Sequence, residues 1–101
     1  MQATEALQKV HGSKYTVGNY AEVGLYRTAG TSKDWALGPR PNGAGIKYAM
    51  SMELRPTSSD YNINFVLPPK EIIPTGEEIW AFHLSVAQQI IEEFGHVTIV
   101  P

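Results

Sequence analysis

The segment IKYAMSMELRPT, residues 46–57, carries a carboxylate at a position where its chemistry could be used. Side-chain types alternate along the segment, which predicts a strand with a core-facing set and an outward-facing set. The core-facing set is apolar and comprises Ile46, Tyr48, Met50, Met52 and Leu54. Glu53 falls in the outward set, near the small hydroxyl residue Ser51. A carboxylate can serve as a general base, but glutamates are usually exposed, so this segment alone favours a solvent-facing side chain.

Metal chemistry has few candidate ligands in this sequence. There are no cysteines, which excludes a thiolate metal site and a disulfide scaffold. The three histidines are His11, His83 and His96, and none has a glutamate three positions later. Such scattered histidines are typical of structural or exposed positions, so we expect no metal ligands in this chain.

The composition limits the classes of function. With 101 residues, of which 43% are hydrophobic, the chain fits one small domain or part of a larger one. Its 8 basic and 10 acidic residues leave a formal net charge of -2, which argues against binding to nucleic acid or to an anionic membrane. No apolar run approaches the length of a membrane span. The start, MQATEALQKVHG, lacks the charged and apolar regions of a signal peptide.

Two helices are predicted from periodicity and local stop signals. Near the start of the chain, apolar residues recur at helical spacing before Gly12, a natural C-terminal stop. This short segment is expected to be the end of a longer helix. The second helix is predicted over Glu77 to Phe94, with a capping box formed by Thr75 and Glu78 and a stop at Gly95. Its predicted packing stripe consists of Ile79, Phe82, Val86 and Ile90.

Between these helices the chain is rich in loops. A helical turn is predicted around residues 32–37, and GPRPNGAG at 38–45 is a loop by composition. Long irregular connections are uncommon in small domains and tend to carry function, which raises interest in their residues.

Several ordered segments together resemble the zinc metallocarboxypeptidases, the family of carboxypeptidases A and B. They are LYRTAGTSKDW at 25–35, GIKYAMSMELRPT at 45–57, FVLPPKEIIPT at 65–75 and the following EEIW. The resemblance implies that residues 1–101 are the C-terminal portion of a peptidase catalytic domain. It further implies an α/β fold, a partial mixed-sheet α/β/α sandwich of the zinc carboxypeptidase type.

The resemblance gives Glu53 a catalytic role. In the family the glutamate of this motif takes a proton from a zinc-bound water as the water attacks the scissile carbonyl. It then gives that proton to the leaving amine, as a general base and acid do. The implied cofactor is one zinc ion in the complete enzyme, whose ligands lie upstream of the matching region. Without those ligands, the isolated chain is expected to be inactive.

The same resemblance implies a set of substrate-binding residues. Tyr26 matches a mobile tyrosine that covers the C-terminal residue of a bound peptide, and Thr28 and Ser51 match positions that line the specificity pocket. Lys33, just before Asp34 and Trp35, matches the base of that pocket. A lysine there favours peptides that end in Asp or Glu, although a lysine in a loop can equally point into solvent.

The implied substrates are peptides with free C-termini, and the implied location is extracellular, because the family is mostly secreted. An alternative remains open at this point: a non-catalytic, truncated relative that acts as a binding module. A native mass close to that of the 101-residue chain would favour this alternative.

Overall fold

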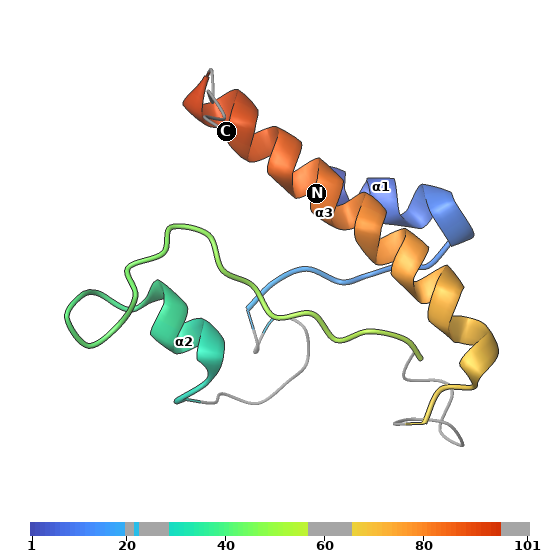
Figure 1. Cartoon of the computed structure of the whole chain (residues 1–101), viewed down its shortest axis with the longest axis horizontal. Helices are drawn as coiled ribbons and strands as arrows, with labels where there is room; N and C mark the ends of the chain where they lie inside the picture. Colours follow the sequence, from blue (N-terminus) through green and yellow to red (C-terminus); the bar gives the residue numbers. More distant parts are fainter. Residues whose placement is uncertain (20–21, 23–28, 57–65, 96–101) are drawn as a thin grey trace, which may run out of the picture. The chain divides into compact units, whose positions relative to one another are not determined.

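The computed structural model describes residues 1–19, 22, 29–56 and 66–95. Its elements in chain order are α1 (Gln2–His11), α2 (Ser32–Leu37), the 3₁₀ helix η2 (Pro69–Glu71) and α3 (Ile72–Phe94) (Figure 1). The chain forms two compact units. The first, here the α1–α3 unit, comprises Met1–Tyr15 and Arg55–Pro101, and the second, the α2 unit, comprises Thr16–Leu54.

The predicted α/β sandwich is wrong for this structure, because the described residues contain helices and no strand. The segment 47–54 runs without regular secondary structure (Figure 1), and the apolar side chains expected to face a core are exposed, except for half-buried Met52. Alternation of side-chain types indicates which face of a strand is apolar. A strand also needs a neighbour to pair its N–H and C=O groups, and no neighbouring strand is present in the part of the chain that the structure describes.

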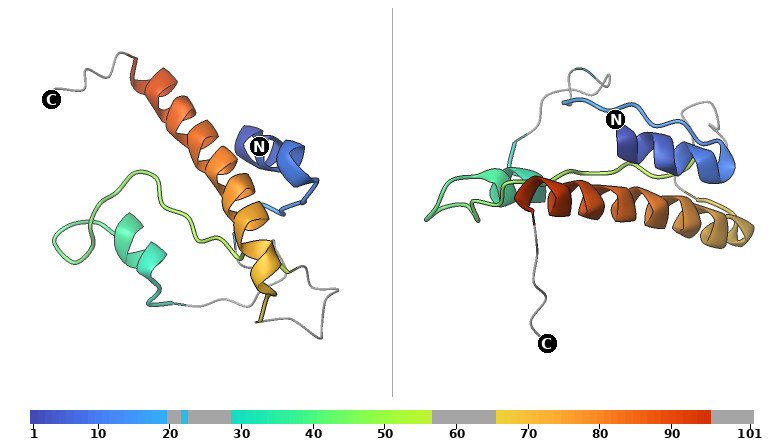
Figure 2. Two further views of the ribbon diagram at one scale, coloured as in Figure 1. Left: turned by 45° about the vertical axis from the view of Figure 1, so that its right-hand side comes forward. Right: turned by 90° about the horizontal axis from the view of Figure 1, so that it is seen from above.

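The first predicted helix is confirmed as α1. Gly12 ends it in the left-handed conformation, with φ of 79°, and donates its N–H to the Gln8 carbonyl oxygen at 2.7 Å. Glycine adopts this conformation without the steric penalty of a Cβ atom. α1 packs beside α3 (Figure 2). Two of its residues, Ala3 and Leu7, lie one turn apart and are fully buried. These two side chains and Phe82 of α3 form the small apolar core of the α1–α3 unit.

The second predicted helix is confirmed as α3, but it begins five residues earlier, at Ile72. Its stop at Gly95 is also confirmed. The predicted capping box is wrong, because Thr75 lies inside the helix, with its buried hydroxyl lacking a hydrogen-bond partner. Glu78 instead binds an arginine far away in the sequence. Pro74 is compatible with this earlier start, because the N–H groups of a first helical turn have no intrahelical acceptor.

Apolar side chains occur on two sides of α3. The predicted stripe is confirmed, since Phe82 is buried and its three companions are half-buried. Successive residues turn about 100° around a helix, so a side chain two positions away from Phe82 lies on the far side. That far side carries exposed apolar residues at Ile73, Trp80, Leu84, Ile91 and Phe94. Within the described residues, no helix combines the length and apolar character needed to cross a membrane.

The α2 unit is organised by a cap and a closed loop. The Thr31 hydroxyl accepts from the Asp34 N–H at 3.2 Å, and the Asp34 carboxylate accepts from the Thr31 N–H at 3.0 Å. This reciprocal pair starts α2 at the position predicted for a helical turn. After α2, the backbone folds back so that the Gly45 N–H donates to the Gly38 carbonyl oxygen at 2.8 Å.

Gly43 is required by the close approach inside this loop. A Cβ atom added to it would overlap the backbone of Gly38, with the Gly38 Cα only 2.7 Å away. The Gly43 N–H also donates to the Pro39 carbonyl oxygen at 2.9 Å. The predicted loop at 38–45 is therefore confirmed, and it is a compact turn that leaves no room for a side chain at Gly43.

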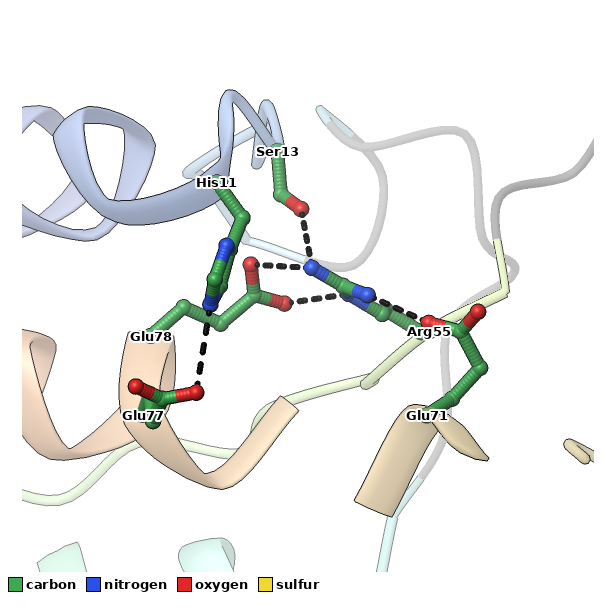
Figure 3. A network of polar contacts seen from close by, with 6 residues as sticks. All are labelled: His11, Ser13, Arg55, Glu71, Glu77 and Glu78. Carbon is green, nitrogen blue, oxygen red and sulfur yellow. Dashed lines mark hydrogen bonds and ion pairs between the residues drawn. The ribbon is translucent and has the colours of Figure 1, made fainter. Parts of the chain in front are cut away.

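A partly buried ionic cluster connects distant parts of the α1–α3 unit (Figure 3). Arg55 donates from Nε and Nη2 to the two carboxylate oxygens of Glu78, at 2.7 Å and 2.8 Å. Its Nη1 donates to Glu71 Oε2 at 2.6 Å, and Nη2 also donates to Ser13 Oγ at 3.2 Å. The Glu78 side chain is 0% exposed and that of Arg55 is 18% exposed, so the pair is held away from water. Beside it, His11 Nε2 lies 3.5 Å from Glu77 Oε1.

The cluster changes the proton affinity of its members. Burial by itself would raise the pKa of Glu78, but hydrogen bonds from Arg55 and Ser13 and the charge of Arg55 outweigh it, so that pKa is lowered. Hydrogen bonding to Glu78 raises the pKa of Arg55 against the opposing effect of burial. Burial also raises the pKa of the Tyr15 hydroxyl, and the negative charge of Glu78 adds to that effect.

Replacing Gly43 by alanine is expected to open the loop after α2. We expect a local destabilisation of about 1–3 kcal/mol, because the new methyl group overpacks against Gly38. Amide hydrogen exchange at Ala44 and Ile46, followed by NMR, should accelerate. Gly76→Ala in α3 is the matched control: its Cβ meets nothing within 4 Å, and it should stabilise the helix by about 0.5–1 kcal/mol. Unchanged exchange at Ala44 in the Gly43 variant would show that the loop tolerates a side chain.

Acidification is expected to weaken the α1–α3 unit through Glu78. The folded state lowers the pKa of this carboxyl from its ordinary 4.5, so its stabilising contribution is complete above that value. The contribution is lost as the pH falls through the folded-state pKa. Glu78→Gln should reduce the free energy of unfolding near neutral pH by roughly 2 kcal/mol and flatten its decline in acid. Urea denaturation at a series of pH values measures this, with Glu77→Gln, which should retain the acid dependence, as the control.

Candidate functional site

The described candidates for catalysis and specificity all lie in the α2 unit. Glu53 and Ser51 are exposed on the irregular segment that follows the closed loop, and Lys33 is a half-buried residue of α2. Tyr26 and Thr28 lie outside the described residues. The placement of Glu53 leaves its carboxylate accessible to a substrate and to water, as a proton-transferring group requires.

The cap of α2 determines the position of Lys33. This lysine is the second residue of the helix, between the capping threonine and Asp34, so the reciprocal hydrogen bonds restrain its backbone. The N–H of Thr31, followed by its hydroxyl, lowers the pKa of Asp34 by hydrogen bonding to the carboxylate. Asp34 therefore has a structural role in the cap.

Backbone hydrogen bonds connect α2 to the segment that carries Ser51 and Glu53. The Ala44 N–H donates to the Trp35 carbonyl oxygen at 2.9 Å, and the Ile46 N–H donates to the Ala36 carbonyl oxygen at 2.8 Å. These bonds satisfy carbonyl groups at the end of α2 that have no intrahelical donor. They also fix where the segment begins, so Lys33, Ser51 and Glu53 are parts of one compact unit.

The ionic cluster around Arg55 was not predicted from the sequence. Arg55 stands in the ELR motif, and its main partner, Glu78, stands in EEIW, but Glu78 was interpreted as a local capping residue. The two residues are 23 positions apart, and no sequence spacing indicates such a pairing. The available signal was that an arginine bordered by apolar residues needs an anionic partner if it is buried.

The described residues do not fit a zinc site. Within 1–19, 22, 29–56 and 66–95, no group of three or more His, Cys, Asp or Glu side chains is placed to hold a metal ion. The carboxylates of Glu71 and Glu78 instead bind Arg55, which neutralises the charge that a cation would need.

Comparisons with known proteins find a matching family profile and several similar sequences. The sequence profile described as "Zinc carboxypeptidase" matches residues 1–82, a range that includes every residue discussed above as catalytic or substrate-binding. A carboxypeptidase B from Astacus astacus is 46% identical over 76 residues, which cover 75% of this chain and 22% of that protein. A carboxypeptidase A2 from Rattus norvegicus is 42% identical over 79 residues, covering 78% of this chain and 17% of the relative.

A carboxypeptidase A5 from Homo sapiens is 45% identical over 78 residues, covering 77% of this chain and 16% of the relative. This chain thus spans between 16% and 22% of the length of these three proteins. No solved structure matches. The profile match and the three relatives agree with the resemblance carried by the ordered motifs. The chain therefore belongs to the zinc carboxypeptidase family, a family of metalloproteases.

Proposed function

We propose that this chain is the C-terminal portion of the catalytic domain of a metallocarboxypeptidase, which releases C-terminal residues from peptides. The observation that carries the proposal is the profile match over residues 1–82, which includes Glu53 in its ELR motif. The exposure of Glu53 supports it, because both water and a peptide substrate can reach an exposed carboxylate.

In this proposal Glu53 acts as the general base and then as the general acid. Its carboxylate takes a proton from the attacking water and returns it to the amine that leaves. Ser51, on the same exposed segment, lines the pocket for the C-terminal side chain. Tyr26 and Thr28 are assigned to substrate binding by the resemblance alone. The zinc ion belongs to the complete enzyme and is held by residues outside this chain, and the complete protein is secreted.

Lys33 is proposed to select the C-terminal residue of the substrate. Its half-buried position in α2 supports this role, because a lysine that is partly removed from water favours an anionic partner. The preferred peptides would then end in Asp or Glu. The positive charge of the lysine would attract an anionic C-terminal side chain, whereas an apolar side chain would gain nothing from it.

The test of the general base uses the native protein, purified with an antibody against α3 and weighed first by mass spectrometry. A native mass near 11.1 kDa would contradict the proposal of a longer enzyme. In the complete enzyme, Glu53→Gln should lower kcat by about 10²–10⁴-fold with little change in KM, while Glu92→Gln on exposed α3 should have no effect. The 101-residue chain alone should release no C-terminal residue with zinc added. Zinc-dependent release by that chain would refute its predicted inactivity.

The test of specificity compares kcat/KM for peptides that differ only in a C-terminal Glu, Leu or Lys. The complete enzyme should prefer Glu, and Lys33→Leu should lower the Glu-to-Leu ratio about tenfold or more, equivalent to about 1.4 kcal/mol. Lys14→Leu, a change at an exposed lysine of the α1–α3 unit, should leave the ratio unchanged. A wild-type preference for Leu or Lys would rule out the proposed role of Lys33.

A further inference from the structure

Arg55 donates hydrogen bonds to three residues, although the proposed chemistry gives it no role. Its guanidinium nitrogens Nε, Nη1 and Nη2 donate to Glu78, Glu71 and Ser13 over distances of 2.6–3.2 Å (Figure 3). The partners come from three places: the residue after Gly12, the end of η2 and the second turn of α3. The planar fork of arginine matches the Glu78 carboxylate at two points, which fixes orientation as well as distance.

Net stability is a weak explanation for such a cluster. Removing an arginine and a glutamate from water costs about as much as their attraction returns, so a buried ion pair adds little compared with apolar residues of the same size. What the pair does provide is a defined position, since only one arrangement satisfies both carboxylate oxygens. The Glu78 side chain is 0% exposed, so a shift of Arg55 would leave a buried carboxylate unpaired at a high cost in free energy.

The residue two positions before Arg55 is Glu53. Two residues of extended chain span at most about 7 Å, so fixing Arg55 limits how far the Glu53 backbone can move. Only the peptide bonds through Leu54 separate the anchored residue from the proposed general base. A general base loses much of its effect when it is misplaced by about 1 Å, so restraint at this point bears directly on turnover.

We propose that Arg55 is a positioning residue for Glu53. Its hydrogen bonds to Glu78, Glu71 and Ser13, here called the clamp, restrict where the Glu53 carboxylate can lie. This inference rests on the proposed function of Glu53. It assigns Arg55 no contact with the substrate. It requires the fork geometry of arginine, because lysine has three N–H donors on a single nitrogen and could not make all four of these contacts to Glu78, Glu71 and Ser13.

The experiment measures kcat and KM per active site in the complete enzyme, with active sites counted by titration with a tight-binding inhibitor. Arg55→Lys should lower kcat about 10–100-fold while KM stays within about twofold, because misplacement affects the chemical step more than binding. Arg40→Lys is the matched control, since Arg40 is exposed and its Nε donates to a backbone carbonyl oxygen, that of Ala44.

A second variant tests the same inference in case Arg55→Lys does not fold. Glu71→Gln removes one charged acceptor and leaves the Arg55–Glu78 pair in place, so the protein should fold and lose kcat by a smaller factor, about 2–5-fold. A purely structural role predicts a different pattern: fewer active sites but an unchanged kcat at each of them.

The outcomes separate the two proposals. If Glu53→Gln abolishes turnover but Arg55→Lys and Glu71→Gln keep the wild-type kcat per site, the positioning role of Arg55 is wrong and the proposed function stands. If Glu53→Gln keeps full turnover, the proposed function is wrong and the inference about Arg55 fails with it. Loss of kcat in both clamp variants, with constant KM and an unaffected Arg40 variant, supports the positioning role.

Discussion

A carboxylate that stays charged when it is buried needs a compensating partner, and in the α1–α3 unit Arg55 is that partner for Glu78. The apolar core of this unit is small, with Ala3, Leu7 and Phe82 as its buried hydrophobic residues in the described part of the chain. The unit is also made from two separate stretches of the sequence. The ionic cluster joins both stretches, because Ser13 belongs to one and Arg55, Glu71 and Glu78 to the other. Without Arg55, the buried Glu78 carboxylate would lose the hydrogen bonds that both of its oxygens accept from the guanidinium.

The helices could be predicted because their signals are local. Periodic apolar residues and the glycines at positions 12 and 95 indicate α1 and α3 without knowledge of any neighbour, and both glycines have positive φ angles. The start of α3 was missed because Thr75 and Glu78 also form a plausible local cap. The competing partner of Glu78 lies 23 residues away, and spacing alone carries no information about it.

The strand of the expected sheet was predicted from the alternation of side-chain types alone, which does not show whether a strand has a partner. Alternation in residues 46–57 describes the two faces of a strand, but the backbone hydrogen bonds that stabilise a strand come from a second segment. In the described structure, the hydrogen bonds at the start of this segment go to α2, where Ile46 donates to the Ala36 carbonyl oxygen. The candidate site shows the same division. Motifs suggested Glu53, Ser51 and Lys33 as candidate site residues, whereas the restraint on Arg55 depends on tertiary contacts that no motif encodes.

The two tryptophans of the chain are distributed one to each unit: Trp35 in α2, 61% exposed, and Trp80 in α3, 65% exposed. Each unit therefore carries its own intrinsic fluorophore, and both indole rings are largely hydrated. Emission from such rings is red-shifted and accessible to aqueous quenchers, and it moves to the blue when a surface covers the ring. Single replacement of either tryptophan by phenylalanine would leave a spectroscopic reporter for the other unit alone, without any added label.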